Sequence, residues 1–119
     1  MALHRIAEEL EIADRLQRKG ECDRARVLYE AILAAVPRHH GATLGLARCQ
    51  LNVGEFEEAI ETFRRAKAID PGHHQGRIEL VQSLLLLGLR DEARGELEDL
   101  DRLDPPGPGP TGGLRPRMA

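Results

Sequence analysis

Apolar side chains recur at steps of three and four along most of this chain of 119 residues. Within residues 56–69 the apolar set is Phe56, Ala59, Ile60, Phe63, Ala66 and Ile69. This spacing places the apolar side chains on one stripe of an α-helix, which can then pack against a neighbouring element. Sustained alternation of apolar and polar residues, which would predict a β-strand, occurs nowhere in the sequence.

Several residue types return every 34 residues and divide the chain into repeating units. They are the prolines Pro37, Pro71 and Pro105, the glycines Gly20, Gly54 and Gly88, and the alanines Ala25, Ala59 and Ala93. Three apolar sets keep the same step: Tyr29, Phe63 and Leu97; Ile12, Leu46 and Leu80; Ala13, Ala47 and Val81. A proline ends one helix, a glycine permits a tight turn between two helices, and an alanine lets two helix axes approach closely.

The markers and the apolar spacing together predict six helices and no sheet. Their expected ranges are 3–18, 22–35, 40–53, 56–69, 74–87 and 90–103, with bounds good to about 2–4 residues. A glycine or a proline separates each helix from the next, so consecutive helices should run antiparallel. The predicted fold class is therefore all-α.

The middle unit, LGLARCQLNVGEFEEAIETFRRAKAIDP, resembles the tetratricopeptide repeat (TPR) family. The residues that carry the resemblance are Ala47, Gly54, Phe56, Ala59, Phe63, Ala66 and Pro71. It implies an α-solenoid of three helix-turn-helix units, about 6–39, 40–73 and 74–105, wound into a right-handed superhelix. The outer units depart in places: Cys22 and Arg90 replace the aromatic Phe56, and Val36 replaces Asp70.

Residues 105–119 differ in composition from the 1–104 repeat domain. The segment PPGPGPTGGLRPRMA contains nine Pro or Gly residues and is predicted to be disordered. It cannot supply the capping helix that often closes such an array. The four leucines at 84–87 cover all sides of a helix, so one or two should be exposed. We therefore expect either a marginal monomer or a homo-oligomer that covers this edge.

The resemblance implies a site on the concave wall, which the first helix of each unit forms in this family. The wall positions hold Leu10, Asp14, Gln17, Arg18, Leu44, Arg48, Leu51, Asn52, Ile78, Gln82, Leu85 and Leu86. Charges are mixed toward the N-terminal side, and leucines increase toward the C-terminal side. This pattern favours an extended apolar peptide or an amphipathic helix as the partner. The alternative is that some of these leucines pack between units and never meet a ligand.

One use of the family's groove, clamping the C-terminal carboxylate of heat-shock chaperones, is argued against. That clamp needs Lys, Asn and Arg side chains, which pair with the carboxylate. The matching positions here hold Leu10, Asp14, Gly45, Gln75 and Glu79. None of these is a cation, and the two carboxylates would repel such a ligand.

The composition of the chain argues against several other classes of protein. A net charge of −3 and three aromatic residues give no basic field or stacking platform for nucleic acid. No signal-peptide run and no apolar stretch of membrane-spanning length is present, so we expect a cytoplasmic protein. The two cysteines, Cys22 and Cys49, are expected to be reduced thiols that serve as small apolar core residues.

Catalytic and cofactor motifs are not found. The single serine, Ser83, lies in a leucine-rich stretch without a GxSxG turn, and no phosphate-binding GxxxxGK[ST] loop occurs. We expect no catalytic residues, no cofactor and no enzyme activity.

Two histidine pairs, His39–His40 and His73–His74, suggest a metal, because imidazole is a common ligand. They also repeat with the 34-residue period and stand where a helix begins, so capping of the free N–H groups explains them. Loops of stacked repeats are expected about 10 Å apart, too far to complete a ligand set. We therefore predict no metal site.

The sequence thus predicts a non-catalytic protein-interaction module, an adaptor or small chaperone-like scaffold with a protein or peptide partner. The alternative is a structural subunit that self-associates through its uncapped C-terminal helix edge.

Overall fold

The computed structural model describes residues 2–103, with side chains from residue 5 onward, and the predicted disorder of 105–119 lies outside this range. The described residues form six helices and no strand, which confirms the predicted all-α fold. The helices are α1 (Ala2–Arg18), α2 (Cys22–Ala35), α3 (His40–Asn52), α4 (Phe56–Ile69), α5 (His74–Leu86) and α6 (Arg90–Leu103). No predicted helix bound differs from the observed one by more than one residue.

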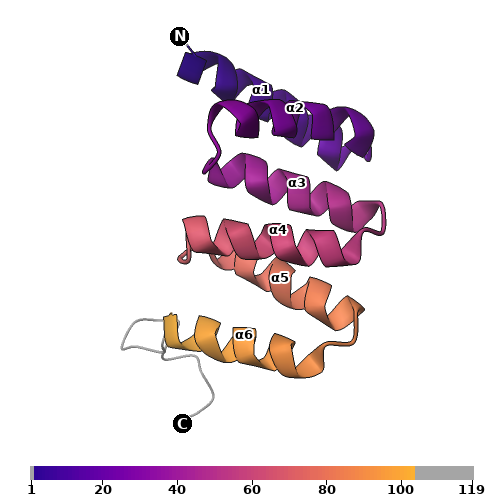
Figure 1. The fold of residues 1–119 in the computed structure, drawn as a ribbon, viewed down its shortest axis with the longest axis vertical. Helices are drawn as coiled ribbons and strands as arrows, with labels where there is room; N and C mark the ends of the chain where they lie inside the picture. The colour runs from indigo at the N-terminus through magenta and orange to yellow at the C-terminus, as the bar shows by residue number, and fades with distance from the viewer. Residues whose placement is uncertain (1, 104–119) are drawn as a thin grey trace.

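The helices form hairpins that stack in chain order along the long axis of the molecule (Figure 1). We call α1–α2 unit 1, α3–α4 unit 2 and α5–α6 unit 3. We call the interface between units 1 and 2 the first joint, and that between units 2 and 3 the second joint. Helix α1 lies at one end of the stack and α6 at the other (Figure 1).

A glycine in the left-handed region makes the turn inside each hairpin. Gly20, Gly54 and Gly88 have φ angles of 84°, 88° and 76°, which side chains with a Cβ rarely adopt. The N–H of the next residue donates to the carbonyl five residues back, for example from Glu21 to Leu16 at 2.9 Å. This bond pattern is the Schellman motif, which satisfies the last carbonyls of the helix. The predicted turn role of the three glycines is confirmed.

Histidine side chains cap the first helix of units 2 and 3. His39 Nδ1 accepts the N–H of Ala42 at 3.1 Å, and His73 Nδ1 accepts the N–H of Gly76 at 3.0 Å. Each bond satisfies one N–H that has no partner inside its helix. The prediction that these histidines cap helix starts is confirmed.

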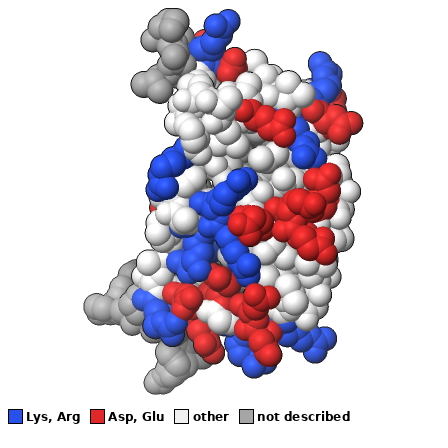
Figure 2. Space-filling model, viewed as in Figure 1, with Lys and Arg blue, Asp and Glu red and all other residues white. Residues whose placement is uncertain are grey.

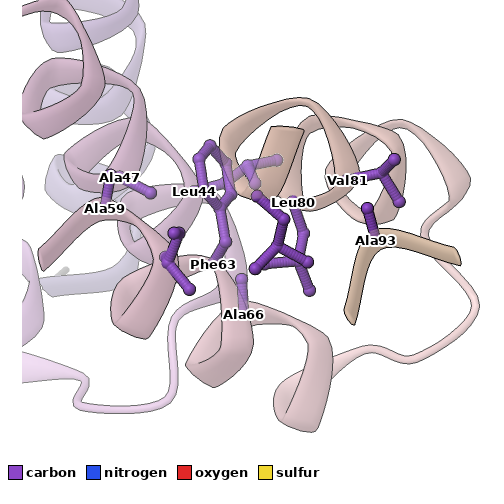
Figure 3. Packing of buried hydrophobic residues seen from close by; sticks show 10 residues of the cluster. Leu44, Ala47, Ala59, Phe63, Ala66, Leu80, Val81 and Ala93 are labelled. Atoms are coloured by element: carbon purple, nitrogen blue, oxygen red, sulfur yellow. The ribbon is translucent and has the colours of Figure 1, made fainter. Parts of the chain in front are cut away.

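The hydrophobic core consists of two clusters, and each cluster fills one joint. The first joint contains Ile6, Ala13, Cys22, Ala25, Tyr29, Ile32, Ala42, Leu46 and Cys49. The second joint contains Leu44, Ala47, Ala59, Ile60, Phe63, Ala66, Leu80, Val81, Leu84 and Ala93 (Figure 3). Since each unit buries its apolar face against the next, the stability of one hairpin depends on its neighbours.

A ring from one unit packs directly on the backbone of the next at the first joint. Tyr29 on α2 is fully buried, and a Cβ added at Gly45 on α3 would lie 2.2 Å from its Cζ atom. The Tyr29 hydroxyl donates to Asp14 Oδ1 at 2.6 Å. Burial, followed by this hydrogen bond, raises the pKa of Tyr29 far above its usual value.

Both cysteines are buried and neither forms a disulfide, which confirms their predicted place in the core. Burial, followed by contact with Cys22, raises the pKa of the Cys49 thiol to about 12, so this thiol stays protonated at neutral pH. Among the helices in the described part of the chain, none has both the length and the apolar character needed to cross a membrane.

Candidate partner-binding groove

The predicted wall residues all lie on α1, α3 and α5, the first helices of the three units, but they differ in exposure. Leu44 is buried in the second joint. Five are half-buried: Leu10, Asp14, Gln17, Arg48 and Leu51. Six are exposed: Arg18, Asn52, Ile78, Gln82, Leu85 and Leu86. Whether a ligand binds to this wall stays a prediction.

The innermost row of the wall holds the units together. A Cβ at Gly41 would lie 3.2 Å from Leu10 Cδ2, and one at Gly76 would lie 3.2 Å from Leu44 Cδ1. Each leucine therefore packs on a glycine of the following unit. The third member of the row, Ile78, has no following unit among the described residues, and it is exposed. Leu44 thus belongs to the core, and charging it would test folding rather than binding.

The charged groups in the middle of the wall bind one another. Arg48 Nε donates to Glu79 Oε1 at 2.9 Å and to Oε2 at 3.2 Å, joining α3 to α5. Gln75 Nε2 adds a bond to Glu79 Oε2 at 3.3 Å. Asp14 receives the hydroxyl of Tyr29. The ion pair of Arg48 with Glu79 offsets two of the charges that a ligand would otherwise meet.

The C-terminal side of the wall is apolar and open. Leu85 and Leu86 are 51% and 61% exposed, whereas Leu84 is fully buried. This outcome confirms the prediction that one or two leucines of the 84–87 run remain exposed. Gln82 is also exposed and lies three and four residues before the two leucines, on the same side of α5. The surface therefore combines apolar area with a side-chain amide.

This combination suits an apolar peptide segment. Leucine side chains can bury apolar side chains of a ligand, while an amide can both donate to and accept from a peptide backbone. Asn52 on α3, which donates to Cys22 Sγ at 3.5 Å, supplies a second exposed amide one unit earlier. This surface thus offers apolar contacts and neutral amide groups to a ligand.

The histidine pairs meet across two loops, contrary to the expected spacing. The rings of His40 and His73 have centroids only 4.6 Å apart, so the argument from loops 10 Å apart was wrong for these two rings. Burial, followed by repulsion from His73, lowers the pKa of His40, and the carboxylate of Asp70 acts against this. Within the described residues, no group of three or more His, Cys, Asp or Glu side chains could hold a metal ion.

The face seen in Figure 2 is built mainly by the second helices and carries charges in bands. Basic side chains gather near the middle, over α4, and acidic side chains lie to their right and, over α6, below them (Figure 2). Arg64 reaches Glu92 at 3.1 Å, and Lys67 reaches Glu96 at 2.9 Å. These bonds cross the second joint and add to its apolar contacts.

A cleft of about 400 Å³ lies away from the wall and was not predicted. Its lining comes from α2, α4, the loop after α2 and the start of α3: Leu33, Pro37, Arg38, Thr43, Arg65, Ala68 and Ile69. The sequence pattern contained no motif that would have identified it.

The pairing of Arg48 with Glu79 was also missed, although the repeat contained a sign of it. The two residues are 31 positions apart, close to the 34-residue step, and residues at nearly that separation face each other across a joint. A search for opposite charges about one unit apart would have found the pair.

Solved structures with similar folds include proteins that hold peptides. The type III secretion chaperone SycD of Yersinia enterocolitica, in complex with a peptide of the translocator YopD, is 19% identical with a TM-score of 0.80. The match covers 88% of this chain and 80% of that chain. The second TPR of Spaghetti (RPAP3), bound to the HSP90 peptide SRMEEVD, is 20% identical with a TM-score of 0.75. It covers 83% of this chain and 92% of that chain.

The same fold also occurs inside an enzyme chain. The Thermobaculum terrenum O-GlcNAc transferase is 25% identical with a TM-score of 0.76, over 84% of this chain but only 19% of the transferase. Among curated proteins, the CTR9 homolog of Arabidopsis thaliana is 32% identical over 88 residues. This match covers 73% of the chain and 8% of that relative's length.

Two tetratricopeptide repeat family models match the chain, over residues 10–74 and 53–108. The first spans more than half of the sequence. With helical hairpins repeating every 34 residues, turn glycines at equivalent places and a core at each joint, the chain belongs to the tetratricopeptide repeat family.

Proposed function

We propose that this chain is a protein-interaction module that binds an apolar peptide segment along α1, α3 and α5, as an adaptor or chaperone-like scaffold. The observation that carries the proposal is the pair of exposed leucines, Leu85 and Leu86, beside the amide of Gln82. Exposed neighbouring apolar side chains are typical of interaction sites. The peptides held by SycD and by the RPAP3 repeat support this use of the fold.

The proposed ligand is apolar rather than acidic. Glu79 and Asp14 line the wall, and Arg48 is already bound to Glu79. An acidic C-terminal peptide would therefore meet repulsion from these two carboxylates, and of the two wall arginines only Arg18 lies outside the Arg48–Glu79 pair. The peptide SRMEEVD, which the RPAP3 repeat binds, serves as a probe that should not bind here.

A phage-displayed peptide library screened against the full chain tests the proposal. Selected peptides should be rich in apolar residues and should shift NMR resonances of α1, α3 and α5. Leu86→Glu should weaken binding about tenfold or more, because the carboxylate would be desolvated against an apolar ligand. Val27→Glu is the matched control, since Val27 is exposed on α2, outside this wall.

Two results would contradict peptide binding along α1, α3 and α5. One is a set of peptides whose resonance shifts map to α2, α4 and α6. The other is a Leu86→Glu variant that binds the selected peptides as tightly as the Val27→Glu variant does. Binding of SRMEEVD in preference to apolar peptides would contradict the proposed apolar ligand.

A further inference from the structure

Helix α6 exposes an apolar side chain that is buried in the other two units. Leu97 is 46% exposed, whereas its equivalents Tyr29 and Phe63 are 0% and 1% exposed. Tyr29 and Phe63 are covered because each lies in a joint with a following unit. Leu97 has the same place in unit 3 without a following unit among the described residues.

The opposite end of the stack shows the complementary exposure. Ile12 on α1 is 47% exposed, whereas its equivalents Leu46 and Leu80 are 6% and 0% exposed. Leu46 and Leu80 are buried because each packs against the unit before it. Ile12 therefore stands at the place where units 2 and 3 pack an apolar side chain against the unit before them.

These two exposed residues are the two sides of one missing joint. Tyr29 shares the first joint with Leu46, and Phe63 shares the second joint with Leu80. By the same register, Leu97 and Ile12 would lie in one shared joint, where Glu11 takes the place that Gly45 has beside Tyr29. The two residues lie on helices at opposite ends of the stack, so they cannot meet within one molecule (Figure 1).

Charges at the two ends agree with this register. Arg26 reaches Glu55 at 3.2 Å across the first joint. Two units after Arg26 the chain carries Arg94, and one unit before Glu55 it carries Glu21. Opposite charges would therefore face each other if the α1 end of one molecule met the α6 end of another.

A second pair agrees with its signs reversed. Arg64 reaches Glu92 across the second joint, and the equivalents at the two ends are Glu98 and Arg24. One contact disagrees: Asn52 meets Cys22 at the first joint, and the matching residues at the ends are Arg18 and Arg90. The other two ion pairs across the joints have no charged equivalent on one side: Gln82 and Glu11 stand for Arg48 and Glu79, and Asp101 and Leu28 stand for Lys67 and Glu96. Of the five contacts, a joint between molecules would thus keep two as attractive pairs and turn one into a repulsive pair.

We propose that copies of this chain stack end to end, with α1 of one copy seated on the α5–α6 end of the next. The joint repeats the internal joints, so it contains both Ile12 and Leu97 and pairs Glu21 with Arg94. Such an interface is heterologous and leaves one open end on each copy, so assembly continues beyond a dimer. This contact uses the ends of the stack and does not depend on the proposed groove function.

Sedimentation velocity of the full chain over a range of concentrations tests the proposal. The average mass should rise with concentration, and Leu97→Glu or Ile12→Glu should each weaken association about tenfold or more, because each buries a charge. Val53→Glu, an equally drastic change on an exposed valine of the middle unit, should associate as the unaltered chain does.

A mixture distinguishes end-to-end stacking from other contacts. The Leu97→Glu chain keeps an intact α1 end, and the Ile12→Glu chain keeps an intact α6 end. Equal amounts of the two should therefore form a dimer and nothing larger. Symmetric contact between two α6 ends would leave the Ile12→Glu chain associating like the unaltered chain, and that result would overturn the proposal.

Charge variants provide a second measurement that leaves the apolar groups intact. Arg94→Glu should weaken association a few-fold, and adding Glu21→Arg in the same chain should restore it. The Glu21 side chain makes no cap hydrogen bond, so the exchange removes no cap from α2. Arg90→Glu should strengthen association by removing the repulsion from Arg18.

Circular dichroism at each step confirms that the variants fold. An unaltered chain that stays monomeric up to its solubility limit would refute the stacking. So would a double exchange that leaves association as weak as Arg94→Glu alone.

Discussion

At the scale of single residues, a few close contacts decide which substitutions the chain tolerates. The strongest case is Gly45, whose missing side chain leaves room for the ring of Tyr29. Glycine normally weakens a helix by about 1 kcal/mol relative to alanine. At Gly45 the helix preference for alanine is opposed by the ring of Tyr29, which leaves no room for a Cβ. Whether Gly45→Ala stabilises or destabilises the chain therefore shows whether this contact exists.

Gly45→Ala should lower the free energy of unfolding by about 1–3 kcal/mol, the usual cost of overpacking a core. Gly95→Ala on α6 is the matched control, because a Cβ there would meet no atom within 4 Å. The control should raise stability by up to about 1 kcal/mol. Urea denaturation of both variants checks the opposite signs, and equal signs would show that Tyr29 does not press on Gly45.

The meeting of His40 and His73 predicts a loss of stability in acid. Burial and the neighbouring His73 lower the pKa of His40 in the folded state below its ordinary value of 6.5. The unfolded chain therefore binds a proton first as the pH falls, which favours unfolding. The loss of unfolding free energy caused by this shift is absent above about pH 7.5. It grows as the pH falls through 6.5 toward the folded-state pKa of His40.

Urea midpoints at pH 7.5 and pH 5.5 measure this effect, and His40→Gln should reduce the difference between them. A variant with the full pH dependence of the unaltered chain would mean that His40 does not contribute.

At the scale of elements, the sequence predicted the helices well because their ends are marked chemically. Proline and glycine recur at each boundary, and the left-handed φ angle of Gly54 explains why a glycine stands there. The burial of side chains was harder to predict. Leu44 has the spacing of a wall residue, but it packs on Gly76 of the next unit. The periodicity of one helix does not tell how close the next unit lies, so it could not predict this contact.

Pairs that cross a joint depend on the placement of two units, which a linear pattern does not specify. The Arg48–Glu79 bond is an example, because it joins α3 to α5. A double-mutant cycle with Arg48→Ala and Glu79→Ala should give a coupling energy of about 0.5–1 kcal/mol that falls with added salt. The exposed pair Arg24–Glu21, within one turn, should give less. Equal couplings would argue that the joint does not hold Arg48 in place.

At the scale of the whole molecule, stability should be uneven along the stack. Helix α3 contributes eight buried residues, and α6 contributes one, Ala93. Segments with few buried contacts open at low free-energy cost. Amide hydrogen exchange at low protein concentration should therefore be fastest in α6 and slowest in α3. Exchange in α6 as slow as in α3 would show that contacts outside the second joint hold the last unit.

Ion pairs across the joints also give the array a direction. In the pairs Arg26–Glu55, Arg48–Glu79, Arg64–Glu92 and Lys67–Glu96, the cation belongs to the earlier unit and the carboxylate to the later one. The surface charges of the units therefore favour the same order of units as the chain connectivity does.

Loss of the middle unit during evolution would break this order. Deletion of residues 40–73 would bring Asp14 opposite Glu79 and Glu30 opposite Glu92, since these replace the arginines at equivalent places. Like charges would then meet at both positions. In a chain shortened in this way, Glu30→Arg should raise the melting temperature, and no rise would mean that charge does not set unit order. The three units share one 34-residue period, but each unit carries charges that match only its present neighbours in the stack.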